Sequence, residues 1–293
     1  LDNLEIIGER YVQDMYRNLP KFVFLTAILS QLIKNTEGGF YAALNEKFHY
    51  YQKYNNSYLN KFRDKYGDID WKTAQEHTFD CSQDDDINRD QPLCIALDTN
   101  ININWMVVGQ PDYFRNRLYT LKSFFVKSPR MLTELCNDFA DYYAPLTNRD
   151  IIFYYDHTFL QGRSATNIET FQETITRVLS KRDFNVYPVY IGQAMEHDKK
   201  HKEIDNGLKG HKNLFPMFNQ PNNEHLLFGM EQTGTKVGPK GWGKDKSGEK
   251  NPDDPLDPVE HRTDGGDAWD TLFIGCNFFR EAISNSSTAG VYD

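Results

Sequence analysis

The sequence predicts an α/β fold built on a mixed five-stranded sheet, and three of its features carry that prediction. Short apolar runs bounded by turn residues mark strands, the first three runs follow one another closely, and longer amphipathic segments alternate with the later runs. Close spacing requires antiparallel neighbours, whereas helical crossovers join parallel ones. The predicted order is therefore β-β-β-α-β-α-β, followed by a long insertion and a last helix.

The five strands are all expected after Pro92. The run Leu93–Leu97 is apolar throughout, which is typical of a strand buried on both faces. The remaining strands are predicted at Trp105–Val108, Arg117–Lys127, Asp150–Asp156 and Phe184–Ile191.

Three helices complete this part of the chain, at Pro129–Tyr143, Ala165–Lys181 and Asp264–Glu281. About 70 residues separate the fifth strand from the last helix and form the insertion. A three-stranded meander followed by alternating helices and strands is the order of an RNase H-like fold.

The first 90 residues differ from the rest and are predicted to form a helical extension. Apolar residues between Tyr11 and Ile33 are spaced as on a helix face, Gly38-Gly39 interrupts the pattern, and Tyr41–Phe62 continues it. An acidic loop, Cys81–Pro92, follows. We therefore expect two parts, residues 1–90 and 91–293.

Composition predicts a soluble, intracellular protein. Hydrophobic residues make up 39% of the chain, yet no apolar run is long enough to cross a membrane. Four cysteines lie far apart and form no C-x-x-C motif, so reduced, buried thiols are expected. The chain begins Leu1-Asp2 with neither an initiator Met nor a basic leader, as a fragment of a longer protein would.

A net charge of −9 argues against nucleic-acid binding unless basic residues are concentrated locally. Two segments do concentrate them, because His197–Lys212 and Lys236–Lys250 each carry five lysines. The candidate contacts to DNA phosphates are Lys199, Lys200, Lys202, Lys240, Lys244, Lys246 and Arg262.

Aspartates mark a candidate metal site. Asp98 follows the first strand and Asp156 ends the fourth, and in this strand order the two strands are neighbours. The last helix adds Asp264, Asp267 and Asp270. Carboxylates brought together repel one another unless cations lie between them, and oxygen ligands favour Mg²⁺ or Mn²⁺. Two such ions about 4 Å apart hydrolyse phosphodiesters.

Each aspartate also has an ordinary structural interpretation. An aspartate at a strand end is usually a turn former or a helix cap. Asp264 follows Thr263 at a helix start and suits an N-cap, with Asp267 reaching back as in a capping box.

Several short motifs resemble those of phage terminase large subunits. Glu260–Leu272 resembles the motif that closes their nuclease, where an acidic residue followed by Ala opens the last helix. The weaker matches are Ile95–Asp98, Tyr154–Asp156, the basic loop Lys244–Lys250, and, near the start, Leu19–Phe22 and Gly39–Tyr41.

The resemblance implies an endonuclease that cuts double-stranded viral DNA during genome packaging. Its metal ligands would be Asp98, Asp156 and Asp267, with Asp264 or Asp270 either a fourth ligand or structural. The resemblance also implies two bound Mg²⁺ or Mn²⁺ ions and a location in the host cytoplasm. The implied partners are the small terminase subunit, the portal and the procapsid, and no membrane is implied.

A terminase motor also needs an ATPase, and the chain departs from that pattern. Gly238–Asp245 has the form G-x-x-x-x-G-K but ends in Asp where Ser or Thr should hold Mg²⁺. We therefore predict no ATP hydrolysis and expect the ATPase upstream or removed.

Other interpretations remain open. Another RNase H-like nuclease, such as a junction resolvase, would prefer branched DNA, and a DNA-binding module would keep the fold without the metals. His197 and His201 lie one helical turn apart but lack the Glu of a zinc peptidase motif, so a solvated helix is expected there. His157 could position water or phosphate beside Asp156.

Overall fold

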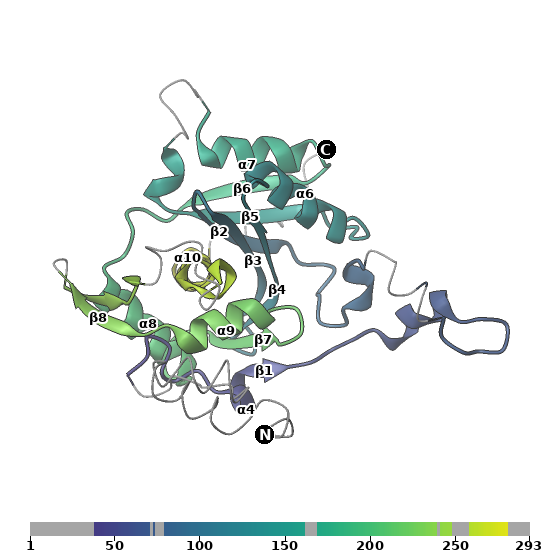
Figure 1. The fold of residues 1–293 in the computed structure, drawn as a ribbon, viewed down its shortest axis with the longest axis horizontal. Helices are drawn as coiled ribbons and strands as arrows, with labels where there is room; N and C mark the ends of the chain where they lie inside the picture. Colours follow the sequence, from purple (N-terminus) through teal and green to yellow (C-terminus); the bar gives the residue numbers. More distant parts are fainter. Residues whose placement is uncertain are drawn as a thin grey trace, which may run out of the picture.

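The computed structural model describes residues 38–70, 73, 79–161, 169–238, 241–247 and 258–280 (Figure 1). A seven-stranded sheet runs through it in the order β1-β7-β4-β3-β2-β5-β6. In sequence order its strands are β1 (Tyr50–Tyr51), β2 (Leu93–Thr99), β3 (Ile103–Asp112), β4 (Arg117–Lys127), β5 (Asp150–Tyr155), β6 (Asn185–Tyr190) and β7 (Phe215–Asn219).

All five predicted strands are present, as β2 to β6, and the predicted fold class is confirmed. Within the sheet β3 runs antiparallel to both of its neighbours, while the other strand pairs are parallel. The order β4-β3-β2-β5-β6 with β3 reversed is the RNase H-like arrangement. The prediction did not include β7, which comes from the insertion, or β1, which precedes the acidic loop; both extend the sheet beside β4.

The sheet is covered on both faces (Figure 1). Helices α6 (Leu132–Tyr142) and α7 (Phe171–Ser180) lie on one face, where they enclose Ile95 and Leu97 of β2. On the other face lie α8 (His197–Leu208), α9 (Glu224–Gln232) and α10 (Thr263–Phe278), which enclose Cys94 and Ala96. The alternation explains why the run that forms β2 must be apolar throughout.

Helix α10 lies unusually close to the sheet. A Cβ atom on Gly275 would come within 2.3 Å of the Tyr154 ring on β5, so only glycine allows this approach. The predicted helix at Asp264–Glu281 is confirmed from its start to Phe278, and Glu281 lies outside the described residues.

Helix α7 begins later than predicted. Thr170 and Glu173 form a capping box, in which each side chain bonds the other residue's backbone N–H. Of the expected helix at Ala165–Lys181, residues 165–168 lie outside the described residues.

The insertion contains α8, β7, α9, the hairpin β8 (Thr235–Gly238) and β9 (Gly241–Lys244), and the 3₁₀ turn η6 (Val259–His261). It therefore supplies the edge strand β7 and much of the cover over one face of the sheet. No described helix is both long enough and apolar enough to cross a membrane.

The expected helix at Tyr41–Phe62 is not formed. This stretch contains instead the four-residue helix α4 (Glu46–His49), strand β1 and the 3₁₀ helix η2 (Asn56–Phe62). Asn45 and Asn55 each accept a backbone N–H two residues on, which starts a new turn, and Tyr50-Tyr51 pairs with β7. The helix expected between Tyr11 and Ile33 lies outside the described residues.

The segment before the acidic loop contributes to the main core. Phe40, Tyr41 and Leu44 are buried in the cluster beneath α10. The boundary proposed at residue 90 stays a prediction. All four cysteines are free and buried, as the sequence predicted.

Candidate functional site

Asp98 and Asp156 leave the sheet at matching positions. Ala96 of β2 is paired with Tyr154 of β5 in a parallel register, and each aspartate lies two residues farther along its chain. Because side chains alternate along a strand, both aspartates share the face that Ala96 and Tyr154 present to α10. Two neighbouring strands thus deliver a carboxylate to the same edge and the same face.

Asp98 has a half-buried carboxylate with no compensating contact. Within the part of the chain that the structure describes, no hydrogen bond or ion pair reaches it. Burial raises the pKa of Asp98 well above its usual range, and the negative charges of Asp267 and Asp264 raise it further. These repulsions show that the first strand and the last helix bring their carboxylates close together.

Asp156 has one oxygen in use. Its Oδ1 accepts hydrogen bonds from the backbone N–H of Thr158 at 2.9 Å and from the Thr158 hydroxyl at 2.6 Å. This capping of the 3₁₀ turn η4 (His157–Leu160) fits the structural interpretation. Among the described residues no donor reaches Oδ2, so that oxygen is available to a ligand.

Asp267 is held by two lysines. Its Oδ1 lies 2.8 Å from Lys244 Nζ and its Oδ2 lies 2.6 Å from Lys246 Nζ. Burial on its own would raise the pKa of Asp267, but Lys244, Lys246 and Lys200 together hold it far below the usual range. Asp267 therefore stays ionised, which a metal ligand must be.

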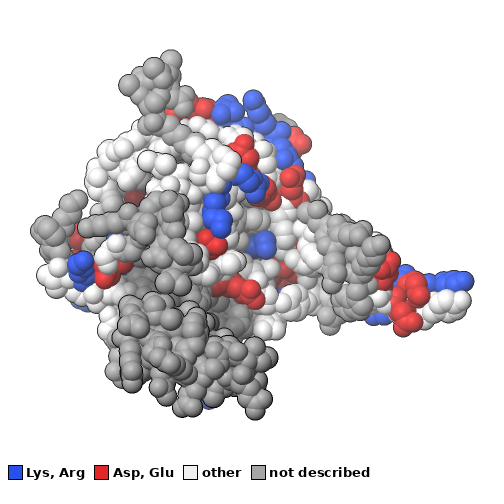
Figure 2. Space-filling model, in the orientation of Figure 1, with Lys and Arg blue, Asp and Glu red and all other residues white. Residues whose placement is uncertain are grey.

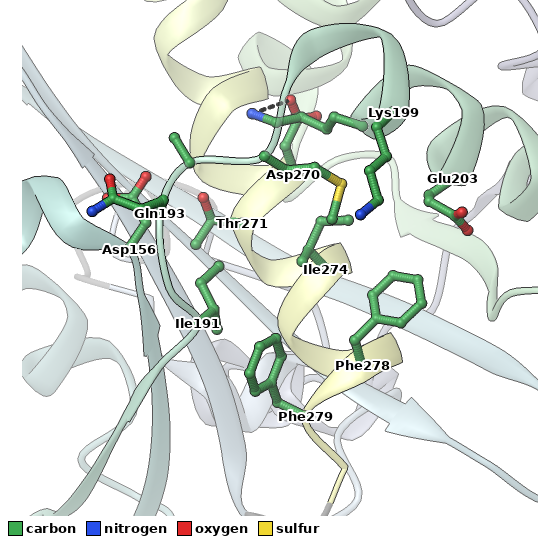
Figure 3. Close-up of a pocket in the computed structure, with 13 residues that line it drawn as sticks. Asp156, Ile191, Gln193, Lys199, Glu203, Asp270, Thr271, Ile274, Phe278 and Phe279 are labelled. Atoms are coloured by element: carbon green, nitrogen blue, oxygen red, sulfur yellow. Dashed lines mark ion pairs between the residues drawn. The ribbon is translucent and has the colours of Figure 1, made fainter.

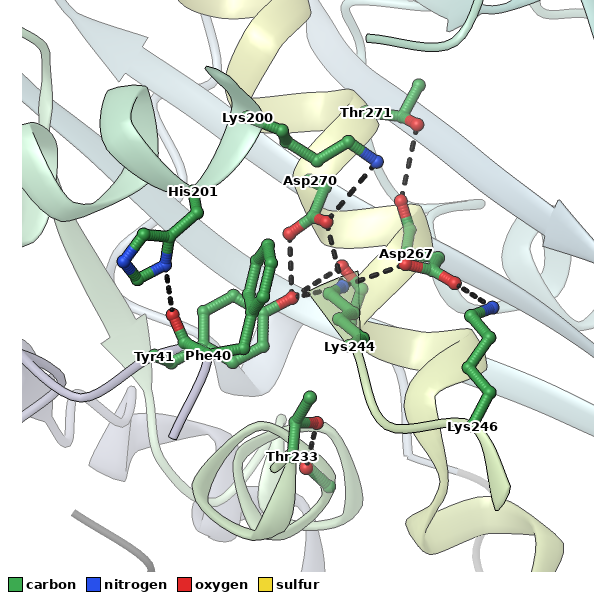
Figure 4. A network of polar contacts seen from close by, with 12 residues as sticks. Phe40, Tyr41, Lys200, His201, Thr233, Lys244, Lys246, Asp267, Asp270 and Thr271 are labelled. Carbon is green, nitrogen blue, oxygen red and sulfur yellow. Dashed lines mark hydrogen bonds and ion pairs between the residues drawn. The ribbon is translucent and has the colours of Figure 1, made fainter. Parts of the chain in front are cut away.

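Asp270 anchors a buried polar network (Figure 4). Its Oδ1 accepts a 2.6 Å hydrogen bond from the Tyr41 hydroxyl, and its Oδ2 lies 2.7 Å from Lys244 Nζ and 3.5 Å from Lys200 Nζ. Lys244 also donates to the Tyr41 hydroxyl at 2.6 Å. We call Tyr41, Lys200, Lys244 and Asp270 the lysine network. Both oxygens of Asp270 are thus engaged by protein groups, which favours the structural interpretation, and its role stays a prediction.

Asp264 lies in the first turn of α10 and is buried. Its Oδ1 accepts a 3.0 Å hydrogen bond from the side chain of Asn100, in the turn between β2 and β3. The structure thus ties the end of β2 to the start of α10. Whether Asp264 also binds a metal stays a prediction.

Lys200 connects the network to the second strand end. Burial would lower the pKa of Lys200, but Asp270, Asp267 and, more weakly, Asp156 raise it. Its ammonium group therefore lies between the carboxylates of α10 and the carboxylate that follows β5.

The predicted DNA contacts fall into three groups. Lys199, Lys202 and Lys246 are exposed. Lys200, Lys244 and Arg262 are largely buried, and the side chain of Lys244 has no exposed surface. Lys240 lies outside the described residues. On the face shown in Figure 2, acidic and basic side chains are interspersed among the residues that are coloured.

Neither the nucleotide-like motif nor the histidine pair forms a site. In the G-x-x-x-x-G-K match, the lysine that would reach a phosphate is Lys244, which is buried against Asp267 and Asp270. His201 contacts the Phe40 carbonyl at 2.9 Å, and His197 packs against Gly243. His157 lies beside Asp156, with Nδ1 3.3 Å from the Tyr190 hydroxyl.

The carboxylates have the chemistry of a Mg²⁺ or Mn²⁺ site, but they are not yet arranged as one. Among the described residues no three His, Cys, Asp or Glu side chains converge closely enough to hold an ion. Lys244 and Lys246 form ion pairs with Asp267, whereas the same two lysines offset the charge of Asp98 only without direct contact among the described residues. Hard oxygen donors and an unpartnered carboxylate fit a divalent cation, which would relieve the repulsion at Asp98.

The sequence did not indicate the lysine network. Tyr41 and Lys244 lie more than 200 residues apart and meet only through tertiary packing. The sole signal was the high lysine content of the insertion, which suggested surface contacts.

No protein-family model matches the chain, and no curated protein does. Among solved structures it is similar to the large terminase of a thermophilic bacteriophage in complex with ATP-γ-S, at 9% identity and a TM-score of 0.47. That match covers 95% of this chain and 54% of the other, so the chain spans about half the length of that terminase.

Two nuclease structures are also similar. The P22 large terminase nuclease domain matches at 12% identity and a TM-score of 0.38, covering 67% of this chain and 95% of the other. The large terminase nuclease of thermophilic phage G20c, with bound magnesium, matches at 9% identity and a TM-score of 0.37. This match covers 63% of this chain and 81% of the other. All three of these solved structures are large terminases or their nuclease parts.

Proposed function

We propose that the chain is a divalent-metal-dependent endonuclease that hydrolyses phosphodiester bonds of double-stranded DNA. The observation that carries this proposal is that Asp98 and Asp267 lie close together, while Asp156 leaves the neighbouring strand at the same end of the sheet. Asp98 of β2 and Asp156 after β5 share one edge and face of the sheet, and Asp267 of α10 lies close enough to raise the pKa of Asp98. A fold gains no stability from such repulsion, so a ligand-binding role is favoured.

Asp98, Asp156 and Asp267 would hold the metal, with Asp264 as a candidate fourth ligand. Carboxylate oxygens favour Mg²⁺ or Mn²⁺, and their number suits two ions. Bound there, the ions would supply positive charge beside the phosphodiester and polarise water for attack on phosphorus.

The other residues of the site would position these ligands and the DNA. Asp270 and Lys244 fix the turn of α10 that carries Asp267, and Asn100 fixes Asp264. The exposed Lys199, Lys202 and Lys246 would contact phosphates. Such contacts orient a duplex without reading its sequence, so we expect low sequence specificity.

We further infer a role in viral genome packaging, where the enzyme would cut concatemeric DNA in the host cytoplasm. The motif resemblance at Glu260–Leu272 supports this role. The small terminase subunit, portal and procapsid would be its partners. An ATPase would belong to another part of the machine.

Plasmid cleavage tests the proposal. The wild type should cut linear and supercoiled plasmid with Mn²⁺ or Mg²⁺ but not with EDTA. Asp98→Asn and Asp267→Asn should abolish cutting, whereas Asp138→Asn, on the opposite face of the sheet, should not. No cutting by the wild type, together with no Mn²⁺ binding by calorimetry, would leave a DNA-binding module. A strong preference for four-way junctions over linear duplex would indicate a resolvase.

A further inference from the structure

A cavity of about 270 Å³ lies directly beside the candidate site (Figure 3). It is enclosed by the chain after β6, by α8 and by the second half of α10. Asp156, the candidate ligand after β5, lines it, and so do Lys200 and Asp270 of the lysine network. The cavity therefore opens onto the place where we expect the phosphodiester to bind.

The wall of the cavity is mostly apolar. The side chains that make it so are Ile191, Ala194, Met195, Ile274, Phe278 and Phe279. In Figure 3, Phe278 and Phe279 lie at the lower end of the cavity, and Asp156 and Gln193 lie on its left side. Phe278 is 47% exposed, so part of its ring is accessible from the cavity or the solvent.

We propose that this cavity binds an unpaired nucleobase next to the scissile phosphate. The inference rests on the proposed nuclease function and adds a substrate class to it: DNA in which at least one nucleotide near the cut is unstacked.

Three properties of the cavity favour a base as the occupant. Its volume is near the lower limit of about 300 Å³ for small-molecule pockets, which suits one heterocycle better than a larger group. Aromatic side chains at one end offer flat apolar surfaces on which any base can stack. Gln193 and Glu203 at the rim offer a donor and acceptors for the polar edge of a base.

The charges around the cavity fit the rest of a nucleotide. Lys199 lines the rim and is exposed, and within the described residues no ion pair engages it. A phosphate at the rim would therefore meet a positive charge on α8, across the cavity from Asp156 (Figure 3). An apolar side chain of a protein partner would use the same wall but would have no use for this lysine.

Binding of single-stranded oligonucleotides tests the proposal without cleavage. In EDTA, fluorescence anisotropy would compare oligothymidylate with an oligonucleotide of the same length and charge made of abasic residues. The wild type should bind the base-bearing strand roughly tenfold more tightly, because stacking on an aromatic side chain contributes about that factor per base.

Two variants separate the cavity from the general charge of the protein. Phe278→Ala removes an aromatic wall, and Ala194→Trp fills the space from an exposed position. Both should reduce the preference for the base-bearing strand to near unity and leave abasic binding unchanged. The matched control is Phe114→Ala, because Phe114 is 97% exposed in the turn between β3 and β4 and does not line the cavity. Thermal melting of each variant verifies folding.

Equal affinity of the wild type for the two strands, or an unchanged preference in both cavity variants, would overturn the proposal and would leave an apolar side chain as the occupant. The nuclease proposal fails by a different result, namely no metal-dependent cutting. Cutting without a base preference would refute only the cavity, and a base preference without cutting would refute only the nuclease.

Discussion

Lys244 carries a charge that the fold buries completely, and Lys244→Met tests whether this charge holds the site together. Its ammonium group lies 2.8 Å from Asp267, 2.7 Å from Asp270 and 2.6 Å from the Tyr41 hydroxyl. Methionine keeps much of the side-chain volume but leaves two carboxylates short of a partner. Removing one member of a buried pair typically costs about 3–5 kcal/mol.

The expected loss lies near the lower end of that range. Lys200 remains 3.5 Å from Asp270, and Lys246 remains 2.6 Å from Asp267, so neither carboxylate becomes wholly isolated. We expect the free energy of unfolding to fall by about 3 kcal/mol.

Urea denaturation at neutral pH, with the slope checked for two-state behaviour, measures this loss. Lys246→Met is the matched control, because its side chain is 41% exposed and an exposed pair contributes only about 0–1 kcal/mol. Adding Asp270→Leu to Lys244→Met should restore part of the stability, since an apolar replacement removes the stranded charge. Equal losses in the Lys244 and Lys246 variants would refute the assignment of a buried network.

Three other residues give predictions that single substitutions can test. Asp98→Asn should raise the thermal midpoint of the metal-free protein by a few degrees at neutral pH, because the repelled carboxylate is lost. Added Mn²⁺ should raise the midpoint of the wild type but not that of the variant, and scanning calorimetry measures both effects. Burial raises the pKa of Asp84 from 3.8 to about 6, against the hydrogen bonds that it accepts. Its contribution to the free energy of unfolding therefore falls by roughly 2 kcal/mol as pH rises from about 4 to about 6. Urea unfolding of both proteins at each end of that interval measures this effect. The free energy of unfolding of Asp84→Asn should rise relative to that of the wild type as pH increases. An equal difference between the two proteins at both pH values would contradict this. Gly275→Ala should lower the free energy of unfolding by about 1–3 kcal/mol or more, because the new methyl group would overlap the Tyr154 ring; unchanged stability would mean that α10 can shift away from β5.

The sheet could be predicted from sequence because its strands carry local signals. The apolar run that forms β2 and the one that forms β5 need no tertiary information, and a carboxylate at each end follows from reading two residues onward. The edge strands β7 and β1 gave no such signal, since they are short and depend on pairing with β4 and with each other.

The network at the site could not be predicted for a related reason. An ammonium group buried by Asp267 and Asp270 looks in the sequence like any other lysine of a basic segment. Tyr41 was expected only as the first residue of a helical stretch, whereas its hydroxyl bonds to α10. Periodicity reports which side chains face a core, but it does not report which polar groups meet there.

The close contact between Gly275 and Tyr154 also decides what can move at the site. With no room for a side chain at that point, α10 packs directly against the Tyr154 ring of β5, and this contact resists movement of the helix that carries Asp267 toward the sheet. The lysines that neutralise Asp267 come from β9 and the residues after it, outside this contact. A cation could therefore bind when Lys244 and Lys246 release Asp267, without a displacement of α10 on the sheet.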